Sequence, residues 1–72
     1  MSSNEYLTTG EIARMMGTTK YTLFHYDQLG IFSPEARGEN DYRYYTVRQM
    51  DVLDAIITLR ELGMPLPEIK EY

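Results

Sequence analysis

The sequence predicts a single, mostly α-helical domain that carries one small β-hairpin. Apolar residues recur at helical spacing in three stretches, and a capping residue and a glycine bound each of them. Only a short turn with a glycine separates the first two stretches. A segment over 38–46 instead joins turn-forming residues to closely spaced tyrosines, which favours a hairpin.

The first helix is expected to begin after Thr8, because Thr8 and Glu11 have the spacing of a capping box. Gly17 is suited to end it. One apolar face follows from the i, i+3, i+4 spacing of Ile12, Met15 and Met16, and the methionines are expected to fill the core.

The second helix is expected over about 20–29, with Thr19 as its cap and Gly30 as its stop. Leu23, Tyr26 and, near the end, Leu29 should face inward. The two helices over about 8–29 therefore have the spacing of a helix-turn-helix.

A hairpin is expected over about 35–45, after Pro34 prevents any continuation of the helix. Tyr44 and Tyr45 should point to opposite faces of its second strand. Thr46 and Gln49 then cap a third helix over about 47–62, whose broad buried face comprises Met50, Val52, Leu53, Ile56, Ile57 and Leu59. Residues 65–72 are expected to start a fourth helix, whereas residues 1–6 are expected to be a polar lead-in.

Composition limits the function classes. The chain has 72 residues, seven basic and eleven acidic side chains, a formal charge of −4, no cysteine and one histidine. No nucleophile–base pair, phosphate-binding loop or metal cluster is evident, so neither an enzyme, a cofactor nor a metal is expected. No signal peptide or membrane span is evident either, and a cytoplasmic setting is the default expectation. The acidic balance argues against a nucleic-acid binder, which is usually basic, unless the fold gathers the basic residues on one face.

Five motifs in order resemble the N-terminal domain of the MerR family of bacterial transcription regulators. They are Thr9-Gly10-Glu11-Ile12-Ala13, Leu23-Phe24-His25-Tyr26-Asp27, Gly30-Ile31-Phe32-Ser33-Pro34, Asn40-Asp41-Tyr42-Arg43-Tyr44-Tyr45 and Leu62-Gly63-Met64-Pro65-Leu66. The match covers about 6–69, and the wing motif is most similar to the multidrug-responsive branch.

The resemblance implies a winged helix-turn-helix that binds double-stranded promoter DNA as a dimer and acts indirectly on RNA polymerase. It also implies a following dimerisation helix and an effector domain. We expect the 72 residues to be one domain of such a protein, monomeric in isolation, with an effector that the sequence does not identify.

The second helix would enter the major groove, with Thr19, Lys20 and Tyr21 as base and phosphate contacts. Family members often carry arginine and then an aromatic residue where this chain has Phe24 and His25. Phe24 is therefore expected to pack instead of contacting phosphate. His25 either donates a hydrogen bond to DNA or fills space.

In the wing, Tyr42 and Arg43 match the family's phosphate contacts, while Asp41 replaces a common glycine. Asp27 is interpreted as a structural hydrogen-bond acceptor. Three further arginines are candidate backbone contacts on the first and third helices: Arg14, Arg48 and Arg60.

Two other functions fit the same residues. One is a winged-helix protein-interaction module, which the acidic balance, Phe24 and the exposed tyrosines favour. The other is a small excisionase-like architectural DNA binder.

Overall fold

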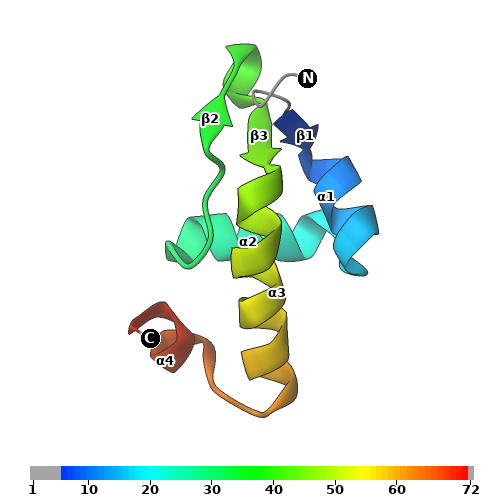
Figure 1. Ribbon diagram of the computed structural model, residues 1–72. Coiled ribbons are helices and arrows are strands. Elements are labelled where there is room, and N and C mark those ends of the chain that lie inside the picture. The colour runs from blue at the N-terminus through cyan, green and yellow to red at the C-terminus, as the bar shows by residue number, and fades with distance from the viewer. Residues whose placement is uncertain (1–5, 72) are drawn as a thin grey trace.

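The computed structural model describes residues 6–71 and confirms a mostly helical fold with a small sheet (Figure 1). Its elements in order are β1 (Tyr6–Thr8), α1 (Thr9–Met16), α2 (Lys20–Leu29), β2 (Ala36–Arg37), a 3₁₀ turn (Glu39–Asp41), β3 (Arg43–Thr46), α3 (Val47–Glu61) and α4 (Leu66–Glu71). The sheet lies at one end of α3 and α4 lies near the other, while α2 crosses behind α3 in this view (Figure 1).

The predicted caps set the helix boundaries. Thr8 and Glu11 form both hydrogen bonds of a capping box at the start of α1, and Thr46 and Gln49 do the same for α3. Gly17 follows α1 with φ 73°, a left-handed conformation that glycine adopts without steric cost. Local capping therefore ends α1 close enough to α2 to build the helix-turn-helix.

The first strand was not predicted, and the expectation of a polar lead-in over 1–6 is wrong at Tyr6. Residues 6–8 pair antiparallel with β3, with Tyr6 opposite Thr46 and Thr8 opposite Tyr44. The strand depends on a partner almost forty residues away, so local sequence carries little sign of it. Residues 1–5 and 72, which the predictions also covered, lie outside the described part of the chain.

The wing is the predicted hairpin. It pairs β2 with β3, so that β3 is the central strand of a three-stranded sheet. Asn40 and Asp41 at the tip have φ of 60° and 61°, the left-handed conformation that Asn and Asp tolerate better than most residues. Tyr45 points into the core and Tyr44 to the other face, as the alternation predicts.

The core lies where α1, α2, α3 and β3 meet. Its buried apolar members are Ile12, Ala13, Leu23, Tyr26, Phe32, Tyr45, Leu53, Ile56 and Ile69. Met15, Val52 and Leu29 were expected inside but are exposed. Each lies at the margin of its helix's apolar face, and no other element of residues 6–71 covers that margin.

No helix within residues 6–71 is long and apolar enough to cross a membrane. The same residues contain no group of three or more His, Cys, Asp or Glu side chains placed to hold a metal ion.

Candidate nucleic-acid interface

The outward face of α2 carries three polar or aromatic side chains in one row. Leu23 and Tyr26 anchor the opposite face in the core. Tyr21 is 79% exposed, and His25 and Gln28 follow it at i+4 and i+7 on the same side. Two of the three were predicted contacts. The spacing from Tyr21 could have identified Gln28 as well.

Thr19 has a local role at the start of this helix. Its Oγ1 accepts the backbone N–H of Thr22 at 3.1 Å and lies 3.0 Å from the Thr22 hydroxyl. These are the bonds of an N-cap. A base contact from Thr19 stays a prediction, and its hydroxyl would have to serve the cap at the same time.

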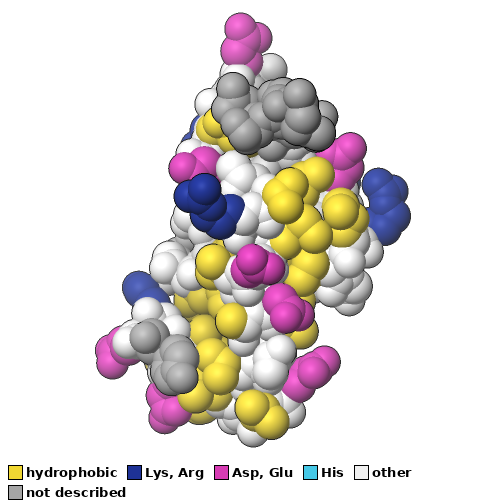
Figure 2. Space-filling view, viewed as in Figure 1, with side chains coloured by type: hydrophobic (Ala, Val, Ile, Leu, Met, Phe, Trp, Pro, Cys, Tyr) yellow, Lys and Arg dark blue, Asp and Glu magenta, His cyan; other side chains and the backbone are white. Residues whose placement is uncertain are grey.

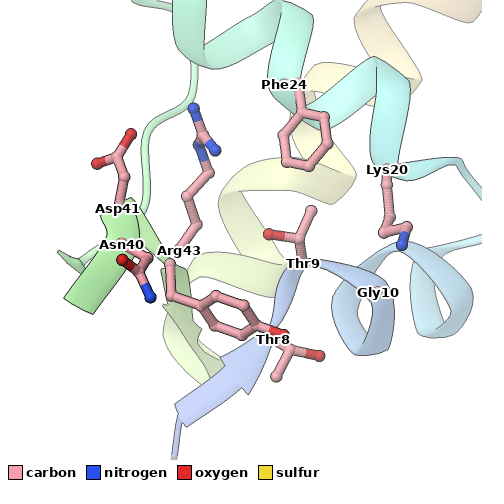
Figure 3. A pocket seen from close by; sticks show the side chains of 9 residues that line it. Thr8, Thr9, Gly10, Lys20, Phe24, Asn40, Asp41 and Arg43 are labelled. Atoms are coloured by element: carbon pink, nitrogen blue, oxygen red, sulfur yellow. The ribbon is translucent and has the colours of Figure 1, made fainter. Parts of the chain in front are cut away.

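A cleft of about 350 Å³ opens between the starts of α1 and α2 and the tip of the hairpin (Figure 3). The basic side chains of Lys20 and Arg43 line it together with Thr8, Thr9, Gly10, Phe24, Asn40, Asp41 and Tyr42. Sequence reasoning identified Lys20, Tyr42 and Arg43 singly, and the fold brings them to one cleft. Sequence reasoning did not identify residues 8–10 as part of the cleft lining, because their place in it depends on how α1 packs against the hairpin.

Asp27 on α2 binds two arginines of the wing, as its predicted role of acceptor requires. Its side chain is 8% exposed and accepts hydrogen bonds from Arg37 Nη2 at 2.8 Å and from Arg43 Nε at 2.8 Å. Arg37 also pairs with Asp41 at 3.3 Å. The cluster therefore joins the second helix to both strands of the hairpin.

This cluster resolves a conflict within the hairpin. Arg37 and Arg43 are directly opposite each other in the β2–β3 register. Like charges in such a cross-strand pair repel. The Asp27 carboxylate lies within hydrogen-bonding distance of both guanidinium groups and offsets that repulsion.

The environment of Asp27 shifts its pKa in two opposing ways. Burial raises the pKa of the carboxyl group, because it penalises the charged form. Hydrogen bonds from Arg43 and Arg37, the nearby Ser33 side chain and the charge of Arg37 lower it. The lowering effects prevail, so the pKa of Asp27 lies below its ordinary value and the carboxylate is charged near neutral pH.

Phe24 also contacts the Arg43 guanidinium, which lies over its ring. The guanidinium carbon lies 4.8 Å from the centroid of the Phe24 ring, within the range of a cation–π contact. Phe24 thus packs against Arg43, although the ring is still 38% exposed and lines the cleft. That it makes no contact with phosphate stays a prediction.

The other predicted arginines lie apart from the cleft. Arg14 is exposed in the last turn of α1, and Arg48 is exposed in the first turn of α3. Arg60 lies near the opposite end of α3 from the wing, where its Nη1 donates to the Met64 carbonyl at 3.5 Å. The fold thus does not bring all the predicted basic residues onto one patch.

The face that α3 presents in Figure 2 carries acidic side chains between apolar ones, with a few separate basic side chains and no visible histidine. This is the side of the molecule opposite α2, which lies behind α3 in the same view. The side of the molecule that is turned away from α2 therefore carries several acidic side chains.

The comparisons with known proteins agree with this architecture. The family described as "MerR HTH family regulatory protein" matches residues 7–72. The "Multidrug-efflux transporter 2 regulator" of Bacillus subtilis is 50% identical over 66 residues, which are 92% of this chain and 24% of that protein. The chain thus spans about a quarter of the length of this relative.

Two solved structures superpose closely. HiNmlR, a MerR family regulator lacking the sensor domain and bound to promoter DNA, has a TM-score of 0.84 at 31% identity, covering 93% of this chain and 53% of that one. MtaN, the N-terminus of the B. subtilis multidrug transporter activator, has a TM-score of 0.83 at 32% identity, covering 90% and 61%. The relatives are transcription regulators, not enzymes. The chain belongs to the MerR HTH family of regulatory proteins, and it forms the winged helix-turn-helix domain of such a regulator.

Proposed function

We propose that this domain binds double-stranded promoter DNA, with α2 in the major groove and the wing on the phosphate backbone. The observation that carries the proposal is the convergence of Lys20, Tyr42 and Arg43 on one cleft at the start of α2. Lys20 in the cleft directly precedes Tyr21, which is exposed and begins the row on α2. A cleft that holds two cationic side chains next to an exposed helix face is an arrangement that can position a recognition helix on DNA.

The side chains divide into two roles. Thr19, Lys20, Tyr21 and His25 contact base edges and nearby phosphates from α2. Tyr42 and Arg43 contact phosphate from the wing, and Arg60 does so from the end of α3. Arg14 and Arg48 are exposed and contribute at the edges of the interface.

The full-length regulator is proposed to act as a homodimer in the cytoplasm, where promoter DNA lies. Two copies would bind the halves of a palindromic promoter, and the distortion of the promoter spacer would affect RNA polymerase. The relative from B. subtilis is named for a multidrug-efflux transporter. We therefore propose that the effector of the full-length regulator is a small molecule, and we assign it no chemical class.

A protein-interaction module is the second candidate function, because the chain carries a formal charge of −4 and Tyr21 and Tyr42 are exposed. Salt dependence separates the two functions. Neutralisation of Z phosphates gives a slope of about −0.9Z in log affinity against log salt. A tyrosine-rich protein interface is much less sensitive to salt. An excisionase-like architectural binder would bind DNA tightly without dimerising.

An amide-shift NMR titration with an inverted-repeat duplex, at low and moderate salt, tests the proposal. We expect salt-sensitive shifts over residues 19–25, at Tyr42 and Arg43, and at Arg60. No shift even at low salt would favour the protein-interaction module. Tight binding by a monomer would favour the architectural binder.

Replacement of the wing arginine gives the sharper test. Arg43→Ala should weaken binding to all duplexes alike and reduce the salt slope by roughly one, since one phosphate contact is lost. Lys70→Ala removes a basic side chain from α4, outside the proposed interface, and should leave the slope unchanged. A change in the preferred sequence with Arg43→Ala would contradict the phosphate role.

A further inference from the structure

The structure assigns Phe24 a positioning role, in that its ring and the Asp27 carboxylate hold the Arg43 guanidinium ready for a phosphate in the cleft. The assignment deepens the proposed function and rests on it. Phe24 stands where family members often have an arginine. Its contribution to DNA binding would therefore run through Arg43 and not through a phosphate contact of its own.

The spacing on α2 places both supports on one side of the helix. Phe24 and Asp27 are three residues apart, and residues at i and i+3 are neighbours on a helix surface. That side faces β3, because Asp27 binds Arg43 and Phe24 contacts the same side chain. One helix turn thus supplies a carboxylate and an aromatic face to a single guanidinium.

The two supports act on different parts of Arg43. Asp27 Oδ2 accepts the Nε–H at 2.8 Å, which fixes the base of the guanidinium plane. The Phe24 ring lies 4.8 Å from the guanidinium carbon, which limits movement of the group above it. The Arg43 side chain lines the cleft and is 25% exposed, so part of it still reaches solvent.

The terminal nitrogens of Arg43 make no hydrogen bond to any residue within 6–71, whereas its Nε does. A phosphate binds a guanidinium through such N–H groups, often two at once. Arg43 can therefore stay bound to Asp27 through Nε while its terminal nitrogens bind DNA. The hydrogen bond to Asp27 and the proposed contact with phosphate therefore use different N–H donors of Arg43.

Holding the side chain in advance should increase affinity. An arginine that is free in solution loses rotamer freedom when it binds, and this loss opposes association. Arg43 has already lost much of that freedom in the unbound domain. Phe24 should accordingly raise affinity for every duplex by the same factor, without adding a charge and without changing the salt slope.

The contact is also expected to be modest. A cation–π contact at a partly exposed site corresponds to a change of about two- to five-fold in affinity. Phe24→Leu, which keeps an apolar side chain but removes the ring, should weaken binding to promoter and unrelated duplexes by about that factor. Phe24→Tyr keeps the ring and should restore affinity to within about twofold of the original.

A double-mutant cycle tests whether the effect runs through Arg43. In the Arg43→Ala background, Phe24→Leu should have no further effect on affinity, because the side chain that it positions is gone. Leu29→Ala is the matched control, since Leu29 lies on the same helix and is also 38% exposed. It should change neither affinity nor its coupling to Arg43. An equal loss from Phe24→Leu in both backgrounds would overturn the assignment and would indicate direct contact of the ring with DNA.

An NMR measurement on the free domain separates failure of this assignment from failure of DNA binding. The ring should shift the Arg43 Nε–H resonance upfield, and the shift should vanish in Phe24→Leu and persist in Phe24→Tyr. An Nε–H resonance that does not respond to loss of the ring would overturn the positioning role. If the resonance responds but the unaltered domain binds no duplex at low salt, the proposed function fails and the role of Phe24 in DNA binding fails with it.

Discussion

Helix α2 is attached to the rest of the molecule on two sides, and the two attachments differ in kind. Leu23 and Tyr26 are buried in the apolar core, where contacts are numerous and non-directional. Phe24 and Asp27 instead contact the wing through a half-exposed ring and an ion pair. The first attachment holds the helix in the fold. The second fixes the direction of a particular side chain, Arg43, relative to it.

The two attachments should respond differently to solution conditions. Burial of apolar surface depends little on pH or on salt at moderate concentrations. The ion pairs at Asp27 require a charged carboxylate, and salt screens the more exposed Arg37. Changes in the core are therefore expected to alter stability, and changes at the wing are expected to alter DNA binding more than stability.

Leu23→Ala should have the largest effect on the core attachment. Leu23 is fully buried, so truncation leaves a cavity and should lower the free energy of unfolding by about 3 kcal/mol. Urea denaturation followed by circular dichroism measures this. Met15→Ala, an exposed apolar position on α1, should change stability by less than about 0.5 kcal/mol. Similar losses for the two variants would contradict the placement of the core.

Asp27→Asn should weaken the wing attachment with a smaller cost to stability. The amide keeps the shape but not the charge. The three hydrogen bonds from Arg37 and Arg43 to Asp27 therefore lose their charge assistance, which should cost about 2 kcal/mol at neutral pH. Asp54→Asn, at an exposed position on α3, is the control and should have little effect.

The same variant should remove a pH dependence. The pKa of Asp27 is lowered in the folded state, so its contribution to stability is present above the unfolded value of about 3.9 and is lost as pH falls through the folded value. Denaturation between about pH 5 and pH 2 should show a steeper loss of stability for the unaltered domain than for Asp27→Asn. Parallel curves would show that the ion pairs contribute nothing.

Arg60→Ala should have the smallest effect, because neither attachment of α2 involves it. Its one hydrogen bond, to the Met64 carbonyl, is long at 3.5 Å, so the side chain is not held in advance as Arg43 is. Ordering it on DNA offsets much of the phosphate contact, and a loss of about twofold in affinity is expected. Fluorescence anisotropy with a labelled duplex measures it. A loss equal to that of Arg43→Ala would show that advance positioning is unimportant.

Much of the fold could be predicted because its signals are local. The capping residues Thr8, Thr19 and Thr46 and the stops at Gly17 and Gly30 set helix boundaries through contacts within four residues. Strand β1 could not be predicted, since three residues become a strand only by pairing with β3.

The candidate site was predictable by residue but not by arrangement. The acceptor role of Asp27 followed from its type and place. Its two partners, Arg37 and Arg43, are brought to it by the hairpin register. The contact between Phe24 and Arg43 depends on how that hairpin packs against α2, which no local pattern specifies.

The shared carboxylate of Asp27 also constrains the order in which this region can change during evolution. Loss of either arginine alone leaves Asp27 with one partner. Loss of both arginines leaves a buried negative charge without any partner. Loss of Asp27 first leaves Arg37 and Arg43 facing each other unopposed. The tolerated order of substitution therefore begins with the loss of one arginine, while the other arginine and Asp27 remain. The effects of substitutions at the three positions should then be non-additive.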